Sequence, residues 1–324
     1  MVAPTLSSNI KGGNPAAQSR LSSPLQDSGS LDRFPHSDLT PVIGREYTGL
    51  QITDILKSED SDRVIQDFAV TVSQRGVVFL RNQDVTPQQM REFGELLSRQ
   101  AGCQKKGGGL THQLSDVSRF ASAGWHSDIS FEPVPSDYAM LKIHELPSTG
   151  GDTLWASGYE VYDRLSPAFA SLLEGLTATH DAGFFHDEAR RLGNPLREGE
   201  RGSPLNFGGE LRAVHPVIRT NPVTGWKSVY VNRGFTRRIN GVTKDESDVI
   251  LQYLFNLLTQ NHDAQVRFKW NKNDIAIWDN RSTWHTATYD YTEARIGDRV
   301  CSLGEAPYLD TLSKSRRQAL NDDS

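Results

Sequence analysis

The tripeptide His-Ser-Asp occurs twice in this chain, at His36-Ser37-Asp38 and at His126-Ser127-Asp128. Side chains two positions apart on a β-strand point to the same face, so His-x-Asp on a strand directs an imidazole and a carboxylate at one point. A histidine from a distant strand would complete a 2-His-1-carboxylate triad. Such a triad leaves half of a metal's coordination sphere open and is typical of non-haem Fe(II) oxygenases.

The second copy is the better candidate for a metal site. Residues 125–131 alternate between an apolar face, with Trp125, Ile129 and Phe131, and a polar face, with His126, Asp128 and Ser130. This alternation predicts a strand whose polar face lines a pocket. The first copy ends a Pro- and Ser-rich segment, where no barrel interior is expected. For the second copy, the alternative is a hydrogen-bonded His/Asp pair at the surface.

His285 is the best candidate for the third ligand. It follows the apolar run Ile275–Trp278 and the turn Asp279–Arg281, and it opens a late strand. A Greek-key topology can bring such a late strand beside an early one. His215 competes for the same role, but we favour a structural role for it near the start of a strand.

Arg295 and Arg299 follow His285 and could bind anions. Four residues apart on an extended strand, they would face the same side, separated by roughly 13 Å. A guanidinium group can bind a carboxylate or a sulfonate through two parallel hydrogen bonds. Two such groups at this spacing suit two adjacent anions, although a pair of exposed surface arginines is the alternative.

These side chains need a framework, and the sequence predicts mainly strands. Strands are expected at 76–80, 125–131, 138–145, 152–155, 213–219, 227–232, 275–278, 285–291 and 299–303. Helices are expected at 60–72, 86–97, 157–173 and 243–258, the last starting with a Thr243/Glu246 capping box. Many strands with few helices indicate an α+β, mainly β fold, a jelly roll with flanking helices.

Two segments are expected to lack regular structure. Residues 1–35 are rich in Ser, Gly, Pro, Asn and Gln without apolar periodicity, which predicts a disordered N-terminal tail. The three glycines Gly107–Gly109 indicate a flexible loop. That loop is either an inert connector or a mobile lid.

Composition argues against several classes of protein. The chain has 324 residues and a formal net charge of −5, whereas nucleic-acid-binding proteins are usually basic. No stretch approaches the ~20 apolar residues of a membrane span, and the start shows no secretory signal. Two cysteines, Cys103 and Cys301, are too few for a disulfide framework or a thiolate zinc site. We therefore expect a cytoplasmic protein that binds neither membranes nor nucleic acids, and a homo-oligomer remains open.

Six segments resemble, in their order along the chain, motifs of the taurine dioxygenase (TauD/TfdA) family: Trp125–Asp128, Glu145–Trp155, Leu165–Phe169, His215–Pro222, Val231–Ile239 and Asn273–Arg281. The resemblance covers about Thr40 to Pro307. It implies a double-stranded β-helix in a single domain, residues 36–324, that binds Fe(II) and 2-oxoglutarate and uses O2. In the implied reaction a C–H bond is hydroxylated while 2-oxoglutarate becomes succinate and CO2.

The resemblance also implies roles for individual residues. His126, Asp128 and His285 match the iron ligands. The Thr153 hydroxyl and the Arg295 guanidinium match the groups that hold the distal carboxylate of 2-oxoglutarate. Arg299 matches the arginine that meets the anionic end of the substrate. The interval from His285 to Arg295 is one residue shorter than in the family, so a swap of roles between the two arginines remains open.

The substrate pocket departs further from the family pattern. Arg99 stands near the place where the taurine enzyme has a sulfonate-binding histidine, and Ser122 or a neighbour replaces an asparagine. These changes argue against taurine itself. The expected substrate contacts are Arg99, Ser122, Ile129, Phe235 and Arg299, with Phe184 and Phe185 as further candidates for the wall.

Three functions are therefore considered. The first is a dioxygenase that hydroxylates a small anionic substrate, most simply a sulfonate, with release of sulfite. The second is a tailoring oxygenase that hydroxylates or desaturates a carboxylate-bearing specialised metabolite. The third is a jelly-roll binding or sensor protein without turnover. The complete set of ligands with Thr153 and two arginines argues against the third, because pure binding does not need an open iron site.

Overall fold

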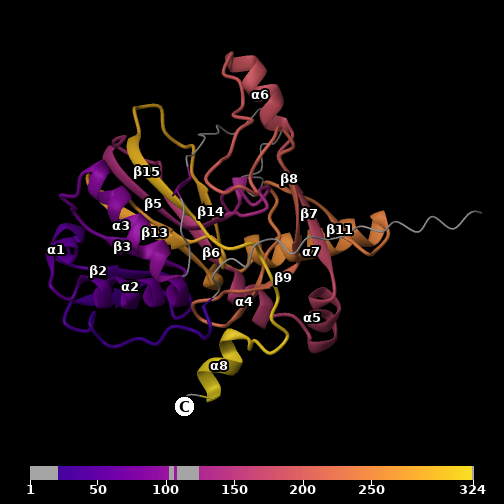
Figure 1. Ribbon diagram of the computed structural model, residues 1–324, viewed down its shortest axis with the longest axis horizontal. Helices are drawn as coiled ribbons and strands as arrows, with labels where there is room; N and C mark the ends of the chain where they lie inside the picture. The colour runs from indigo at the N-terminus through magenta and orange to yellow at the C-terminus, as the bar shows by residue number, and fades with distance from the viewer. Residues whose placement is uncertain (1–20, 102–105, 108–123, 323–324) are drawn as a thin grey trace, which may run out of the picture.

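The computed structural model describes residues 21–101, 106–107 and 124–322 (Figure 1). Its largest sheet has seven strands, in the spatial order β1 (His36–Asp38), β2 (Arg45–Tyr47), β3 (Val77–Leu80), β13 (Ile275–Asp279), β5 (Ser136–Glu145), β15 (Ile296–Leu303) and β4 (Lys106–Gly107). Neighbouring strands are antiparallel, except that β2 runs parallel to β3. The strands adjacent in this sheet are mostly distant in sequence.

Three smaller antiparallel sheets and eight helices complete the described part of the chain. The sheets are β12 (Gln265–Phe268), β6 (Thr153–Ser157) and β14 (Thr283–Ala287); β11 (Thr236–Asn240), β7 (Thr177–Asp181) and β8 (Arg212–Pro216); and β10 (Lys227–Val229) with β9 (Ile218–Thr220). The helices are α1 (Ile52–Lys57), α2 (Ser61–Arg75), α3 (Pro87–Gln100), α4 (Gly158–Asp163), α5 (Pro167–Glu174), α6 (Phe184–Leu192), α7 (Lys244–Gln260) and α8 (Arg316–Asp322), with a 3₁₀ turn at His262–Ala264.

The central strands β3, β13 and β5 of the large sheet are buried on both faces, whereas β1 and the first half of β15 are largely exposed. Along β3, Val78 and Leu80 pack against helices α1, α2 and α3, whereas Val77 and Phe79 pack against residues of β6 and β12. The other face of the β12-β6-β14 sheet packs against α4, α5 and α7. The expected α+β class is confirmed. The structure has several antiparallel sheets, and two of them share a core between flanking helices (Figure 1).

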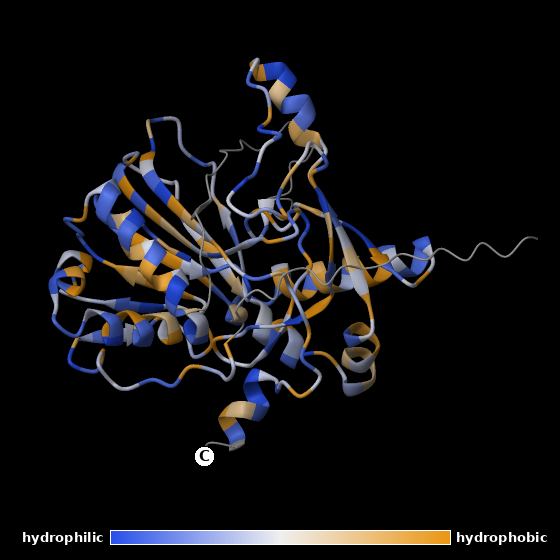
Figure 2. Cartoon of the chain, in the orientation of Figure 1, coloured by the Kyte–Doolittle hydropathy of each residue, from blue (hydrophilic) through white to orange (hydrophobic). Residues whose placement is uncertain are grey.

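The helices predicted at 60–72, 86–97 and 243–258 are confirmed as α2, α3 and α7. Val64, Phe68 and Val72 of α2 are buried, and blue and orange bands alternate along α2 and α3 in Figure 2. Thr86 and Thr243 each form a capping box, at the start of α3 and α7 respectively. Such a box satisfies N–H groups that would otherwise lack partners in the first turn.

Two predicted elements are wrong. The helix expected at 157–173 is two helices, because Pro167 starts α5 behind its own N-cap, Ser166. The strand expected at 125–131 is reduced to an isolated bridge between His126 and His285, after which the chain turns. Ile129 adopts a φ of 44° in this turn, which no strand residue can adopt.

Residues 21–35, which the sequence places in a disordered tail, pack against the helical side of the large sheet. Leu31 is buried, and the N–H of Leu25 donates to the carbonyl of Val223 at 2.9 Å. Ser28 and Ser30 donate to the carboxylate of Asp67. These bonds hold a polar segment in place, so packed structure starts before the predicted boundary; residues 1–20 lie outside the described ranges.

Other expectations concern the central loop and membranes. Of the three glycines expected in a loop, Gly107 ends β4, and Gly108 and Gly109 lie outside the described residues. In the described ranges, no helix combines the length and apolar character needed to cross a bilayer.

Candidate metal centre

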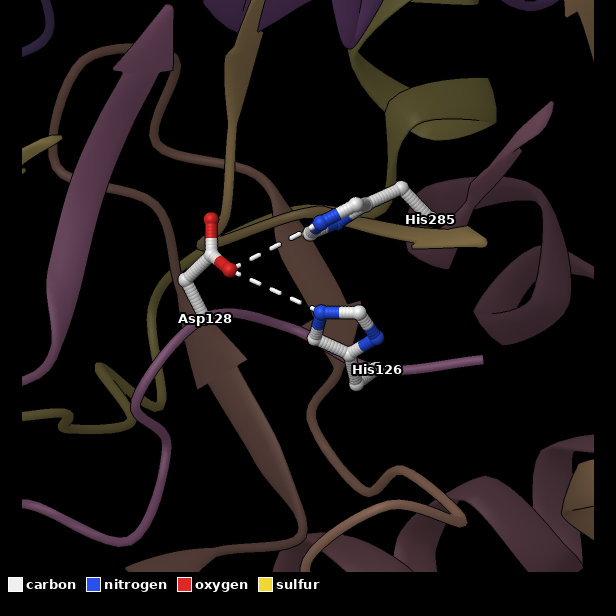
Figure 3. Close-up of side chains that lie close together, drawn as sticks. All are labelled: His126, Asp128 and His285. Atoms are coloured by element: carbon white, nitrogen blue, oxygen red, sulfur yellow. Dashed lines mark ion pairs between the residues drawn. The ribbon is translucent and has the colours of Figure 1, made fainter. Parts of the chain in front are cut away.

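Three side chains converge on one point between the sheets (Figure 3). Their ligand atoms all lie within 4.8 Å of one another, and they belong to His126, Asp128 and His285. Asp128 Oδ1 lies 3.6 Å from Nε2 of each histidine. The sequence-predicted ligands are therefore brought together, although one comes from β14 and the others from a segment about 160 positions earlier in the chain.

The two histidines are joined through their backbones. His126 N–H donates to the His285 carbonyl at 3.1 Å, and His285 N–H donates back at 2.9 Å. β14 is itself paired with β6, so His285 stands on a buried strand. The chain turns after Ser127. The Asp128 carboxylate therefore points toward the histidines because of this turn, and not because side chains alternate along a strand.

The protonation states suit metal binding. Nδ1 of His126 lies 2.8 Å from the Gly124 carbonyl, so it carries the proton and leaves the Nε2 lone pair free. Burial, reinforced by His126, lowers the pKa of His285 well below its usual value. Burial alone would raise the pKa of Asp128, but Arg299 and the two imidazoles hold it well below its usual value. The site thus offers two imidazoles, that of His285 in its neutral form, and an ionised carboxylate.

This donor set fits a divalent first-row cation. Two imidazoles and one carboxylate are the ligands of the facial triad that binds ferrous iron. Asp128 Oδ2 and Nδ1 of His285 are buried without a hydrogen-bond partner among the described residues. A buried carboxylate oxygen without a partner is costly unless an ion or water meets it.

Arg299 contacts the carboxylate ligand directly. Its guanidinium pairs with Asp128 Oδ1, and its guanidinium carbon lies 5.6 Å from the centroid of the Trp278 ring. Burial would lower the pKa of Arg299, but Asp128 keeps it raised. Arg299 also forms a hydrogen bond with the side chain of Cys301, and burial raises the pKa of that thiol to about 11.

Arg295 lies in a separate position, beside Thr153. Its Nη2 donates to Thr153 Oγ1 at 3.2 Å, and its Nε donates to the Gly151 carbonyl at 2.9 Å. The indole N–H of Trp270 also donates to Thr153 Oγ1, at 3.1 Å. A side chain at Gly151 would collide with Arg295, since a Cβ there would lie 2.9 Å from Arg295 Cδ. Arg295 thus pairs with the hydroxyl, and Arg299 with the metal ligand.

An aromatic cluster borders the histidine side of the site. The Phe235 ring meets that of His126 edge-on at 6.1 Å and that of Phe131 at 5.0 Å. Ile129, Phe184 and Phe185 pack against the same cluster. Phe184 and Phe185 begin α6, which projects from the body (Figure 1), and no residue of this helix is fully buried.

The remaining sequence candidates lie elsewhere. Arg99 is exposed in the last turn of α3, and Ser122 lies outside the described residues. His36 lies on the exposed strand β1, with its Nδ1 3.1 Å from the Phe34 carbonyl. Across the described ranges, the triad is the one group of three His, Cys, Asp or Glu side chains that could hold a metal.

Sequence reasoning missed a second buried histidine pair. His215 Nε2 lies 3.0 Å from the carbonyls of both Ser130 and Glu132, and His180 Nδ1 lies 3.0 Å from Ser130 Oγ. The structural role expected for His215 is therefore confirmed. Its partner His180 lies in a polar stretch that carries no apolar signal, so the sequence did not single it out.

A sequence profile of the family described as "Taurine catabolism dioxygenase TauD, TfdA family" matches residues 35–301. The chain is 42% identical to the alpha-ketoglutarate-dependent dioxygenase btcD of Neocamarosporium betae, over 91% of this chain and 98% of that protein. It is 33% identical to an alpha-ketoglutarate-dependent sulfonate dioxygenase of Saccharomyces cerevisiae, over 84% of this chain and 67% of that protein.

A solved structure agrees with these relationships. The crystal structure of a taurine dioxygenase from Burkholderia xenovorans superimposes with a TM-score of 0.68 at 26% identity. The match covers 85% of this chain and 90% of the other. The similarity thus extends over most of both folds.

Proposed function

The chain belongs to the TauD, TfdA family and is an α-ketoglutarate-dependent dioxygenase, and from this premise we propose that it oxidises a C–H bond of a carboxylate-bearing organic substrate. The observation that carries the proposal is the convergence of His126, Asp128 and His285, with ligand atoms within 4.8 Å of one another. α-Ketoglutarate is the 2-oxoglutarate expected from the sequence. The alternative of a binding protein without turnover is set aside, because the relatives are dioxygenases.

In the proposed mechanism the chain holds and orients the reactants. His126, Asp128 and His285 would hold Fe(II). Ferrous iron supplies the activation of O2 that this class of oxidation needs. Thr153 and Arg295 would hold the distal carboxylate of 2-oxoglutarate, because a guanidinium and a hydroxyl at hydrogen-bond distance suit such an anion.

We assign the substrate's anionic group to Arg299. Its guanidinium contacts Asp128, so an anion held by it would lie next to the metal ligands. The separate positions of the two arginines support the original assignment of their roles over the swapped one. Phe235 and Ile129 would contact the body of the substrate, and burial around them would exclude water from the reacting carbon.

Two observations favour a carboxylate-bearing metabolite over a sulfonate. The aromatic cluster of Phe131, Phe184, Phe185 and Phe235 suits a larger apolar body than the two-carbon chain of taurine. The relative from Neocamarosporium betae, at 42% identity, carries no sulfonate in its name. Hydroxylation and desaturation both begin with removal of hydrogen from such a substrate.

A sulfonate substrate is the second candidate. The observation that favours it is the 33% identity to the sulfonate dioxygenase of Saccharomyces cerevisiae. An arginine beside the metal ligands would bind a sulfonate as well as a carboxylate. Hydroxylation of the carbon next to sulfur would release sulfite, which a carboxylate substrate cannot do.

We also propose that residues 36–324 act as a single domain. The family match spans 35–301, and the site draws on Asp128 early in that span and Arg299 at its end. A fragment ending before β13 should therefore neither fold stably nor bind metal. A stable, metal-binding fragment of that length would contradict the proposal.

The first experiment tests the metal site. Anaerobic addition of Fe(II) and 2-oxoglutarate should produce a weak visible charge-transfer band. His126→Ala should abolish this band, whereas His36→Ala, in the other His-Ser-Asp copy, should retain it. A band that survives His126→Ala would contradict the proposed ligand set.

The second experiment tests the substrate. Panels of alkylsulfonates and of carboxylates with apolar bodies are incubated with the loaded enzyme, and succinate and sulfite are measured. We expect carboxylates to stimulate succinate formation. Sulfite release from an alkylsulfonate, with no stimulation by any carboxylate, would replace the main proposal with the second candidate.

A further inference from the structure

Asn280 lies behind the metal ligands, in the connection between β13 and β14, and is fully buried. Its side-chain oxygen accepts two hydrogen bonds, from the backbone N–H of Asp128 at 3.0 Å and from the indole N–H of Trp278 at 3.2 Å. Its side-chain nitrogen donates to Ser136 Oγ at 3.3 Å. Through one amide group, the carboxylate ligand is thus joined to a neighbouring tryptophan.

The Asp128 N–H needs this acceptor because the chain leaves its strand-like path. His126 exchanges backbone bonds with His285, and Ser127 Oγ donates to the Thr283 carbonyl at 2.8 Å. At Asp128 the chain turns away, so no backbone carbonyl of β14 takes the next N–H. A buried N–H without an acceptor is costly, and the side chain of Asn280 replaces the missing ladder partner.

Trp278, the second donor to the Asn280 oxygen, lies beside His285 and Arg299. Its ring lies 4.8 Å from that of His285, centroid to centroid, and 5.6 Å from the guanidinium carbon of Arg299. The bond to Asn280 restricts how the indole can rotate. One oxygen therefore restrains both the carboxylate ligand and the ring that packs on a histidine ligand.

We propose that Asn280 is a positioning residue for the metal centre: its amide oxygen orients the Asp128 carboxylate toward the two histidines and so sets the affinity for the metal. This inference rests on the proposed function, because it takes the triad as the metal site. Asn280 does not itself join the group of ligand atoms. Groups of this kind, one bond away from a ligand, typically change metal affinity by roughly 10–100-fold when they are removed.

The test is a titration of the full chain with Mn(II), in which free Mn(II) is followed by electron paramagnetic resonance. Asn280→Ala should bind Mn(II) roughly 10–100-fold more weakly than the unsubstituted chain. Asn280→Asp keeps an oxygen in the same place and should recover most of that loss. This rescue separates the position of the acceptor from the mere presence of a buried polar group.

Asn206→Ala is the matched control. Asn206 is also fully buried, and it likewise holds backbone groups, accepting from Val134 N–H at 2.9 Å and donating to the Val134 carbonyl at 2.8 Å. Its loss should lower the melting temperature by a similar amount while Mn(II) affinity stays within about twofold. If Asn280→Ala does not fold, Asn280→Ser, whose hydroxyl is too short to reach Asp128, makes the same comparison.

The outcomes separate this inference from the function on which it rests. Equal Mn(II) affinity in the Asn280 variants and the unsubstituted chain would overturn the positioning role alone. An equal loss of affinity in Asn206→Ala would also overturn it, because the effect would then follow from general destabilisation. Absence of Mn(II) binding by the unsubstituted chain, or binding that survives His126→Ala, would overturn the proposed function as well.

Discussion

Two pairs of histidines lie on either side of the same turn, and only one of them faces a carboxylate and could hold a metal. The rings of His126 and His285 are 4.2 Å apart, centroid to centroid, and those of His180 and His215 are 5.2 Å apart. Burial lowers the pKa of His285, His180 and His215 alike. The two pairs are therefore not distinguished by the closeness of their rings or by a lowered histidine pKa.

The difference lies in what their nitrogen atoms meet. Nε2 of His126 and of His285 both face the carboxylate oxygen of Asp128 at 3.6 Å. In the second pair, His215 Nε2 is shared by two backbone carbonyls and His180 Nδ1 is paired with Ser130 Oγ. Histidines whose nitrogens are already bonded to the protein stabilise a turn, whereas histidines that face a carboxylate can bind a metal.

The first prediction removes one histidine of the metal-binding pair. His285→Ala should abolish the anaerobic Fe(II)/2-oxoglutarate band and the formation of succinate, because two ligands cannot hold the ion in place of three. Absorption spectroscopy and a succinate assay measure the two effects. If His285→Ala retained the band, the contrast between the two pairs would fail at its strongest point.

The second prediction removes one histidine of the structural pair. His215→Ala should lower the free energy of unfolding by about 4 kcal/mol, because two buried carbonyls lose their donor and a cavity forms. Urea denaturation measures this loss. Mn(II) affinity should change by less than about threefold, and a complete loss of affinity in the folded variant would show that the two pairs are not distinct.

The third prediction concerns pH. The pKa of His215 is about 4 in the folded protein, mainly because of burial, and about 6.5 when the chain is unfolded. Between these values the unfolded chain binds a proton that the folded chain does not, so stability falls as pH decreases from 6.5 to 4. The loss from His215 amounts to at most about 3 kcal/mol.

Urea denaturation at several pH values checks this linkage. His215→Gln keeps a side chain that can donate to carbonyls but cannot take up a proton, so its stability should depend less on pH than that of the unsubstituted chain. His36→Gln, on exposed β1, is the control and should leave the pH dependence unchanged. Identical pH dependence in all three proteins would rule out His215 as a source.

The fourth and smallest prediction compares two hydroxyls: that of Thr153, which pairs with Arg295, and that of Thr236, which lies beside His180 of the structural pair. Thr153→Val should raise the KM for 2-oxoglutarate roughly fivefold, equivalent to about 1 kcal/mol, because a hydrogen bond to the co-substrate is lost. Thr236→Val removes the hydroxyl that accepts from Asn232 N–H at 2.9 Å and should lower stability without changing this KM. Steady-state kinetics distinguish them, and an equal rise in KM for both would remove the functional distinction.

The candidate ligands and several helices were predictable because they depend on local patterns. Thr86 and Thr243 start helices through capping boxes that span four residues, and Val64, Phe68 and Val72 recur with the period of a helix. The resemblance to the family assigned His126, Asp128 and His285 by their order along the chain. None of these inferences required knowledge of which strands are neighbours.

The predictions that failed depended on contacts between distant segments. The prediction of a disordered tail is wrong for residues 21–35, because the carboxylate of Asp67 on α2 accepts hydrogen bonds from Ser28 and Ser30 in this polar segment. The side chains of His126 and Asp128 were expected to point to the same place because of the alternation along a strand. Instead, the turn that contains Ile129 directs the Asp128 carboxylate toward the histidines. The roles of Arg295 and Arg299 were left open, because they depend on contacts with Thr153 on one strand and with Asp128 on another segment.

The sequence by itself determined the chemical types available at the site, because two imidazoles, a carboxylate and two guanidiniums are properties of residues. It also determined the fold class, through local helix and strand patterns. Only the tertiary structure decided which histidine pair faces a carboxylate and which is bonded to the turn at Ser130. The reason is that the roles of His215 and Asn280 depend on which backbone groups need a hydrogen-bond partner, and only the packing of distant segments determines this.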